Sequence, residues 1–250
     1  MLKKLLKNTF DRFGYDIRKK SNGLKQVNTR KAEGFPLWLK EAQELGIDVN
    51  DHINNKFSDP AKVLEILVFP LIRDLSEPVI CEIGVGTGRW SRAFAKELSF
   101  KKQWKLFIVD HSPWIADFLK NYFKDYQNVF PVLNDGRSLP MIENNYVDLV
   151  FSNGTFVELS LTKIYSYSKE LNRILKTGGI LIFNYLDLNS NEGWDHLKDR
   201  IDYPGNPYTY HTTETIDRIF KENGFEIVER KLLGNSTYVT LKKLHSISNR

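Results

Sequence analysis

Three alternating glycines form the most chemically informative segment of this 250-residue chain. The segment reads Glu82-Ile-Gly84-Val-Gly86-Thr-Gly88 and lies between an apolar β-rich run and an amphipathic helical pattern. Glycines let a backbone turn sharply and let a ligand approach the main chain, and the first amides of the following helix have no partner within that helix. A turn that only packs the helix against the strand is the alternative, but the position between strand and helix favours a nucleotide-type ligand.

The spacing of the glycines separates two kinds of nucleotide site. The dinucleotide fingerprint G-x-G-x-x-G needs its third glycine at position 89, which is Arg89 here. Asp110 follows Gly88 by 22 positions and ends the second β-rich run. A carboxylate at that place can accept hydrogen bonds from both hydroxyls of a ribose. The glycine spacing therefore differs from the dinucleotide fingerprint, and Asp110 is placed to contact a ribose.

In order and spacing these motifs resemble those of the class I S-adenosylmethionine-dependent methyltransferases. The resemblance covers about residues 60 to 243 and includes Glu170 to Ile182, a helix–turn–strand passage in which Thr177 replaces the family's usual proline. It implies S-adenosylmethionine as cofactor, with the glycine turn beneath its methionine part. The cofactor-binding residues implied by the resemblance are Glu82, Gly84, Gly86, Gly88, Asp110, His111, Ser112, Asp135, Gly136 and Asn153.

The resemblance also implies a role for several of these side chains. Asp110 would bind the ribose, His111 and Ser112 would lie beside the adenine, and Asp135 would take the adenine amino group. The Asn-Asp-Gly setting of Asp135 would equally explain a residue that only forms a turn. Asn153 and Gly154 would lie near the methyl donor, at the end of the fourth strand.

Methyl transfer from an activated sulfonium needs mainly alignment of the reacting atoms. A hydroxyl acceptor also calls for a nearby general base. The candidate catalytic residues are His211, Glu158 and His111, and Asp187 and His196 are expected at the same mouth. A solvated or structural role remains open for each. No cluster of His, Cys or Asp has the spacing of zinc ligands, so we expect no structural metal.

The elements that position these residues alternate along the chain. Short β-rich runs occur at 79–83, 104–109, 129–133, 147–151 and 180–185, and most are separated by helical stretches at about 87–98, 113–125 and 161–175. This alternation predicts an α/β fold with a mostly parallel, doubly wound sheet. A helix near 213–223 and two strands near 225–233 and 236–243 follow, and the short Gly234-Asn235 turn makes the last pair antiparallel. The sheet should therefore have seven strands.

Composition divides the chain into three parts. Residues 1–34 are a basic leader and linker, residues 35–76 an N-terminal helical cap, and residues 77–245 the cofactor-binding domain. The formal net charge is +5, but residues 1 to 31 carry +8 and the remainder −3. A mildly acidic body lacks the broad basic face that phosphate backbones require, so no nucleic-acid partner is expected.

The leader combines apolar and basic residues at helical spacing. Residues 1–20 could lie on an anionic membrane surface or a partner, or could fold their apolar face back onto the body. Lysines interrupt any apolar stretch typical of a secretory signal, and the single cysteine, Cys81, lies in an apolar run that suggests a buried thiol. We expect a cytoplasmic protein, with possible contact to the inner face of the membrane, and the sequence leaves its oligomeric state open.

Three hypotheses for function follow. The first is O-methylation of a small polar acceptor, such as a sugar of a bacterial surface polysaccharide or its precursor, because the 188–211 insertion mixes aromatic rings with carboxylates. Those residues are Trp194, Tyr203, Tyr208, Tyr210, Asp195, Asp199, Arg200 and Asp202. The second is an RNA or protein methyltransferase that uses the leader as a substrate arm. The third is a non-catalytic S-adenosylmethionine-binding scaffold.

Overall fold

The computed structural model describes residues 34–57, 60–203 and 206–245. The predictions for the leader before residue 34 lie outside the described residues.

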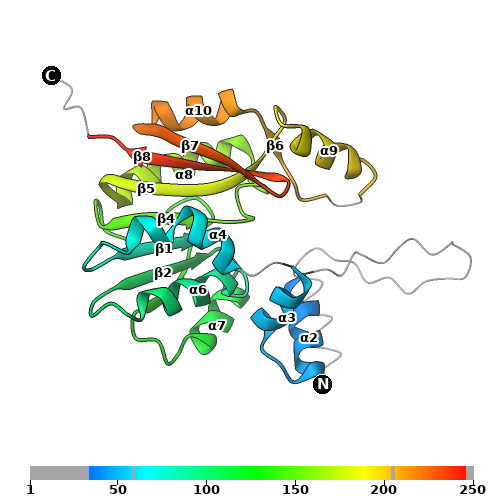
Figure 1. Ribbon diagram of the computed structural model, residues 1–250, viewed down its shortest axis with the longest axis vertical. Helices are drawn as coiled ribbons and strands as arrows, with labels where there is room; N and C mark the ends of the chain where they lie inside the picture. The colour runs from blue at the N-terminus through cyan, green and yellow to red at the C-terminus, as the bar shows by residue number, and fades with distance from the viewer. Residues whose placement is uncertain (1–33, 58–59, 204–205, 246–250) are drawn as a thin grey trace, which may run out of the picture.

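The predicted α/β sheet is confirmed, with the order β3-β2-β1-β4-β5-β8-β7 (Figure 1). The strands are β1 (Val79–Ile83), β2 (Lys105–Asp110), β3 (Val129–Leu133), β4 (Val147–Ser152), β5 (Leu175–Asp187), β6 (Tyr210–His211), β7 (Phe225–Leu233) and β8 (Ser236–Lys243). Strands β1 to β5 run parallel, and β8 pairs antiparallel with both β5 and β7, as the Gly234-Asn235 turn predicts. The short strand β6 adds a parallel pairing to the end of β5.

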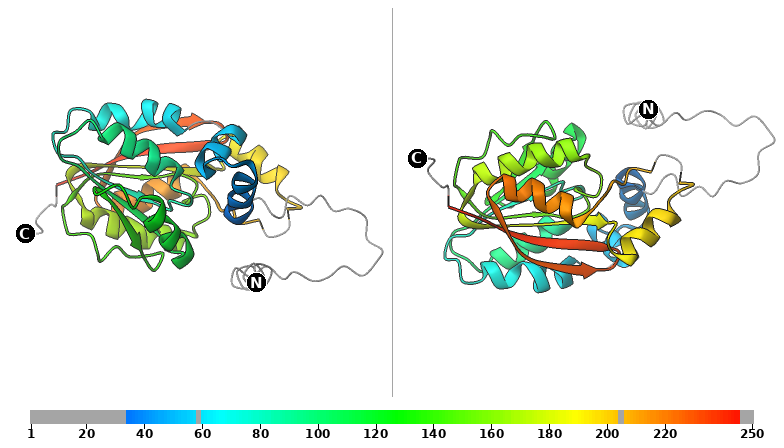
Figure 2. Two further views of the ribbon diagram at one scale, coloured as in Figure 1. Left: turned by 90° about the horizontal axis from the view of Figure 1, so that it is seen from below. Right: turned by 90° about the horizontal axis from the view of Figure 1, so that it is seen from above.

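Helices cover both faces of the sheet (Figure 2). They are α2 (Phe35–Leu45), α3 (Val49–Lys56), α4 (Pro60–Leu67), α5 (Phe69–Ile72), α6 (Arg89–Leu98), α7 (Pro113–Tyr122), α8 (Leu161–Ile174), α9 (Asn191–Asp199) and α10 (Thr213–Glu222). One core contains side chains from α4, α5, α6 and α7, and the other contains side chains from α8 and α10. This is the doubly wound arrangement that the alternating pattern predicts.

The burial of strand β1 explains why the sequence pattern predicts it. All five of its residues are buried, with Ile80 in one core and Cys81 in the other. A strand buried on both faces reads as a continuous apolar run. Cys81 is the expected buried thiol, and burial raises its pKa far above the ordinary value.

The residues predicted as a helical cap, 35–76, divide into two packing units. Helices α2 and α3 form a hairpin that packs on α7, with the ring of Phe35 4.4 Å from that of Trp114 and 5.0 Å from that of Phe118. Gly46, with a φ of 65°, ends α2, and the side chain of Asp48 caps α3. Helices α4 and α5 instead belong to the helical layer on the sheet.

The 188–211 insertion has structure that the sequence pattern did not reveal. It contains helix α9, whose N-cap Ser190 accepts a hydrogen bond from the backbone N of Gly193, and strand β6. In Figure 2, α9 lies at the same end of the molecule as the α2–α3 hairpin. The insertion and the N-terminal hairpin thus both stand near the carboxyl ends of the parallel strands.

Candidate functional site

The glycine turn between β1 and α6 combines two tightly packed positions with one open position. Gly84, Gly86 and Gly88 have φ angles of 73°, 54° and 77°. A Cβ at Gly84 would lie 1.7 Å from Thr155 Oγ1, and one at Gly88 would lie 2.6 Å from Phe123 Cε2. A Cβ at Gly86 would meet nothing within 4 Å. Gly84 and Gly88 therefore let the turn pack, whereas Gly86 faces space that a ligand can occupy.

Asp110, at the end of β2, is held against this turn. Its Oδ2 accepts a hydrogen bond of 3.2 Å from the backbone N of Gly86, and its Oδ1 accepts one of 2.9 Å from the backbone N of Ser112. The side chain is only 6% exposed. Each carboxylate oxygen can accept more than one hydrogen bond, so Asp110 keeps capacity for ribose hydroxyls. Its contact with a ribose stays a prediction.

Two other residues of the predicted set lie near Asp110. The His111 side chain is 77% exposed, with Nδ1 3.7 Å from Asp110 Oδ1. A Cβ built on Gly136 would lie 3.7 Å from His111 Cβ, so these two positions are neighbours. The structure therefore brings Asp110, His111, Ser112 and Gly136 together beside the glycine turn.

Glu82 lies behind the turn rather than on its open side. It is 1% exposed, and its Oε2 accepts a 2.6 Å hydrogen bond from Ser91 Oγ of α6. Burial, together with the nearby Asp110 carboxylate, raises the pKa of Glu82 to about 8, although the hydrogen bond from Ser91 opposes this shift. Its visible contact is therefore to the helix that follows the turn.

Asp135 forms the turn that its sequence setting suggested. Its Oδ1 accepts hydrogen bonds from the backbone N of Arg137 at 2.9 Å and of Ser138 at 2.7 Å, which lower the pKa of this exposed carboxylate. These contacts account for the residue without a ligand. A contact to the adenine amino group stays a prediction.

A cavity of about 490 Å³ lies beside the glycine turn. Its lining is Phe57, Val63, Arg89, Trp90, Asn153, Gly154, Val157, Asn184, Leu186, His196, Tyr208, Leu233, Gly234, Asn235, Ser236 and Tyr238. Arg89 and Trp90 directly follow Gly88, and Asn153 and Gly154 follow β4. The cavity thus opens where the resemblance placed the methyl donor. No Asp or Glu belongs to this described lining, which has two basic residues, Arg89 and His196.

The structure places His196, and not His211, in the lining of this cavity. His211 is buried at 6% exposure, and its Nε2 lies 3.2 Å from the backbone O of Leu159 and 3.1 Å from Thr209 Oγ1. Burial lowers the pKa of His211. His211 lies in β6, which pairs with β5, and it has the contacts of a structural histidine.

The remaining candidate bases also lie outside the cavity lining. Glu158 follows the turn after β4, and desolvation raises its pKa. Asp187 accepts hydrogen bonds from Thr213 Oγ1 at 2.7 Å and from the backbone N of Asn189 at 3.1 Å. Asp187 therefore joins the end of β5 to α9 and α10.

The 188–211 insertion contributes less to the cavity than expected. His196 and Tyr208 line it, with their rings 4.9 Å apart and nearly perpendicular. Asp195, Asp199 and Asp202 are exposed outside the lining. The other walls come from the end of α3 and from the β7–β8 turn, which sequence reasoning did not assign to the site. No motif marks these segments, because only the fold brings them to the carboxyl ends of the parallel strands.

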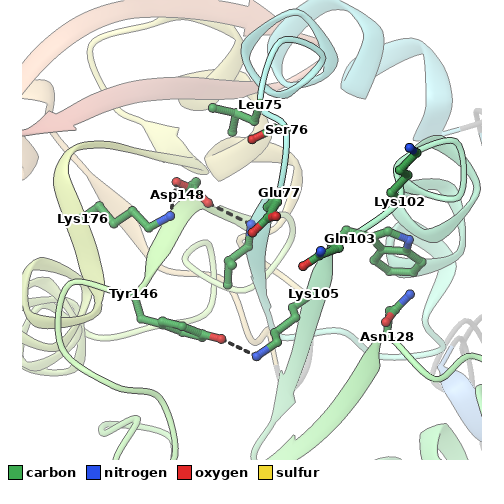
Figure 3. A pocket seen from close by; sticks show the side chains of 12 residues that line it. Leu75, Ser76, Glu77, Lys102, Gln103, Lys105, Asn128, Tyr146, Asp148 and Lys176 are labelled. Carbon is green, nitrogen blue, oxygen red and sulfur yellow. Dashed lines mark hydrogen bonds and ion pairs between the residues drawn. The ribbon is translucent and has the colours of Figure 1, made fainter.

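A larger depression, of about 620 Å³, lies at the opposite edge of the sheet, where the strands begin (Figure 3). Three of its charged groups, Lys105, Asp148 and Lys176, contact other groups of the lining. Lys176 Nζ lies 2.6 Å from Asp148 Oδ1, and Asp148 Oδ2 accepts a hydrogen bond from the backbone N of Val79. Lys105 Nζ contacts the hydroxyl of Tyr146. This depression is larger than the cavity beside the glycine turn, but the length of the sheet separates it from that turn.

Within residues 34–57, 60–203 and 206–245, no group of three or more His, Cys, Asp and Glu side chains is arranged to hold a metal ion. Among the helices in these same ranges, none is long and apolar enough to cross a membrane.

Comparison with known proteins identifies the domain. Residues 80–179 match a family described as a methyltransferase domain. The fold is similar to that of an S-adenosylmethionine-dependent methyltransferase from Aquifex aeolicus, with a TM-score of 0.59, 18% identity, and coverage of 82% of this chain and 98% of the other. The fold is thus that of S-adenosylmethionine-dependent methyltransferases, and residues 80–179 match a methyltransferase domain.

Two further methyltransferases are similar to this chain. Magnesium protoporphyrin IX methyltransferase from Synechocystis PCC 6803, solved with bound S-adenosylhomocysteine, has a TM-score of 0.60 and 16% identity over 96% of this chain and 99% of its own. Phosphoethanolamine N-methyltransferase 1 from Zea mays is 25% identical over 197 residues, which are 78% of this chain. The match spans only 36% of the maize protein.

The geometry of the turn fits S-adenosylmethionine, the cofactor named for the similar methyltransferase from Aquifex aeolicus. The open position at Gly86 leaves room beside the main chain. The buried Asp110 carboxylate is fixed next to that space, where it can accept hydrogen bonds from a ribose.

Proposed function

We propose that this protein transfers the methyl group of S-adenosylmethionine to a small polar acceptor bound in the 490 Å³ cavity. The observation that supports this proposal is the continuity of the cavity with the glycine turn. Arg89 and Trp90, at the start of α6, line the cavity directly after Gly88. On the other side, Thr155 follows the lining residue Gly154 and contacts the backbone O of Ile83 through its Oγ1. Cofactor and acceptor would thus meet at one edge of the sheet.

The protein's contribution to methyl transfer is alignment and proton removal. When bound, S-adenosylmethionine supplies a methyl group already activated by its sulfonium. Gly86 would admit the cofactor and Asp110 would orient its ribose, while the cavity holds the acceptor in line. His196 is the proposed base for a hydroxyl acceptor. Burial, followed by the charge of Arg200, lowers the pKa of His196, so the imidazole is neutral and able to accept a proton at pH 7.

The walls of the cavity favour a polar, ring-shaped acceptor such as a sugar. Trp90, Tyr208 and Tyr238 offer aromatic surfaces, and Asn153, Asn184 and Asn235 offer side-chain amides. Aromatic faces pack against the apolar faces of a ring, and amides bond to its hydroxyl groups. A sugar of a surface polysaccharide or of its precursor is the finer form of this proposal.

The test is a methylation screen with the purified protein. Candidate sugars, sugar phosphates, uronates, phosphoethanolamine, RNA and protein are each incubated with S-adenosylmethionine. Mass spectrometry follows both S-adenosylhomocysteine and a product heavier by one methylene. Asp110→Ala serves as the control for turnover at this site. Methylation of sugars supports the proposal. Methylation confined to RNA or protein, or tight cofactor binding without turnover of any acceptor, would contradict it.

A further inference from the structure

The amide of Asn184 has a fixed orientation at the base of the cavity. Asn184 lies in β5 and is 6% exposed. Its Oδ1 accepts a 2.7 Å hydrogen bond from the backbone N of Gly154. The oxygen is therefore occupied by the protein, whereas Nδ2 has no hydrogen-bond partner among the described residues. Because Asn184 lines the cavity, its unpartnered NH₂ group is available there.

The side-chain oxygen of Asn153 also accepts a hydrogen bond from the protein, but from a different partner. Its Oδ1 accepts a hydrogen bond from the hydroxyl of Tyr238 in β8. Tyr238 is 6% exposed, and burial raises its pKa to about 12. The phenol therefore stays protonated near neutral pH and remains a donor. With its oxygen occupied, Asn153 also keeps its NH₂ group for the cavity, which it lines.

The charged residues of the cavity lining also favour a ligand that accepts hydrogen bonds. Arg89 and His196 are its ionisable basic residues, and Asp and Glu are absent from the described lining. Two amide NH₂ groups beside a basic side chain provide several hydrogen-bond donors and little that would repel negative charge. A group rich in acceptor oxygens, such as a carboxylate or phosphate, matches this arrangement best.

We propose that Asn153 and Asn184 form a donor pair that binds a carboxylate or phosphate group of the acceptor. The inference rests on the proposed function in one respect: the cavity is the acceptor site. It narrows the substrate class to acceptors that carry an anionic oxygen group. Carboxylate chemistry could also come from the methionine part of the cofactor, so the experiment must separate these two sources.

The experiment uses the full chain saturated with S-adenosylhomocysteine and titrates it with inorganic phosphate and with acetate. Binding is followed by calorimetry and by the NMR signals of the asparagine side-chain amides. The test variant is Asn184→Asp, since its carboxylate can still accept from the backbone N of Gly154 but puts an oxygen in place of the NH₂ group. Asn153→Asp makes the same change while keeping an acceptor for Tyr238. Asn191→Asp, at an exposed position outside the cavity, is the matched control.

We expect phosphate or acetate to bind the wild-type protein and Asn191→Asp alike, and to bind either cavity variant at least tenfold more weakly. The affinity for S-adenosylhomocysteine should change less than twofold in Asn184→Asp and in the Asn191→Asp control. If neither anion binds the wild-type protein, or if the cavity variants bind the anions as tightly as the wild type does, the inference is wrong but the proposed function is unaffected. Absence of S-adenosylhomocysteine binding would contradict the proposed function as well.

A third arm distinguishes the acceptor from the cofactor. Methylthioadenosine shares the nucleoside of the cofactor but lacks its carboxylate. If Asn184→Asp weakens S-adenosylhomocysteine binding while methylthioadenosine binding is unchanged, the amide pair serves the cofactor and the proposal is wrong. Thermal unfolding checks that each variant is folded. If one cavity variant is not folded, the other is used for the test, because Asn153 and Asn184 have different hydrogen-bond partners.

Discussion

The side-chain amide of Asn50 in α3 donates a 3.0 Å hydrogen bond to the backbone O of Thr87 in the glycine turn. Asn50 is fully buried, and its Oδ1 has no hydrogen-bond partner in the described structure. The same helix is joined to α6 nearby, where Arg89 Nε donates to Asn54 Oδ1 at 2.6 Å. The N-terminal hairpin is therefore connected directly to the glycine turn, which is the proposed cofactor site.

This connection predicts that Asn50→Ala will affect both stability and cofactor affinity. Loss of a buried hydrogen bond that leaves one partner unsatisfied costs about 1–3 kcal/mol, and Thr87 would lose a fixed neighbour. We expect a lower unfolding free energy in denaturant and several-fold weaker S-adenosylhomocysteine binding by calorimetry. Asn55→Ala, at an exposed position of the same helix, is the matched control. Equal behaviour of the two variants would show that the hairpin does not support the turn.

The glycines of the turn should respond differently to the same added methyl group. In Gly84→Ala the new Cβ would meet Thr155 Oγ1 at 1.7 Å, whereas in Gly86→Ala it would meet nothing within 4 Å. Both variants carry the strain of a positive φ, about 1–2 kcal/mol, and overpacking adds about 1–3 kcal/mol at Gly84 alone. Denaturant unfolding should therefore find Gly84→Ala the less stable of the two.

Gly86→Arg extends this prediction to function. Its long side chain would enter the open space beside the turn, so we expect a folded protein without measurable S-adenosylhomocysteine binding. Circular dichroism and calorimetry on the same sample test both parts. Normal cofactor affinity in Gly86→Arg would place the cofactor elsewhere.

The buried Glu82 predicts a specific dependence of stability on pH. Its pKa in the folded protein is raised to about 8, above the value of about 4.3 for an unfolded glutamate. Between these values the folded state binds more protons than the unfolded state, so stability falls as pH rises from about 4.3 to about 8. In Glu82→Gln this contribution disappears, while the amide oxygen can still accept from Ser91. The difference in unfolding free energy between variant and wild type should therefore grow in favour of the variant across this range.

Other groups titrate in the same pH range, so the comparison is made at each pH between the two proteins. A constant difference from pH 5 to pH 8 would show that Glu82 is ionised in the folded state. A denaturation series at four or five pH values is sufficient to separate these outcomes.

The elements of the sheet could be predicted because they depend on local patterns. The bounds of β1, β3, β7 and β8 agree residue for residue with the apolar runs. Strand β5 begins at Leu175, five residues earlier than its apolar run, and includes Gly178 with a φ of 79°. The pairing of β4 with Leu175 provides the long-range contact that extends this strand, and no local pattern reports it.

The proposed cofactor turn could be predicted from the sequence, whereas the proposed acceptor cavity could not. The glycine turn and Asp110 are separated by few elements and have fixed spacing, so sequence alone indicated them. The cavity is assembled from Phe57, His196, Tyr208 and the β7–β8 turn, which are far apart in the chain. The two-residue pairing of β6 with β5 decides that His211 is buried. Such a short strand has too few residues to show a periodic pattern.

The two histidines provide the sharpest test of the active-site assignment. His196 lines the cavity, and its Nδ1 lies 3.1 Å from the hydroxyl of Tyr210, whereas His211 is buried against Leu159 and Thr209. We expect His196→Gln to keep its stability and its affinity for S-adenosylhomocysteine but to lose about 10²- to 10⁴-fold in kcat on a hydroxyl acceptor, the usual contribution of a general base. His211→Ala should lower the unfolding free energy, while the folded fraction keeps its kcat.

The pH profile separates a base from a residue that only shapes the cavity. Because the pKa of His196 is lowered below 6.5, the wild-type kcat/KM should fall on the acid side as the imidazole takes up a proton. His196→Gln has no such group, so its profile should be flat over that range, with the remaining activity rising only where the acceptor itself ionises. If the acid limb persists in His196→Gln and disappears in His211→Ala, the base is His211, and the cavity described here does not contain the proton acceptor.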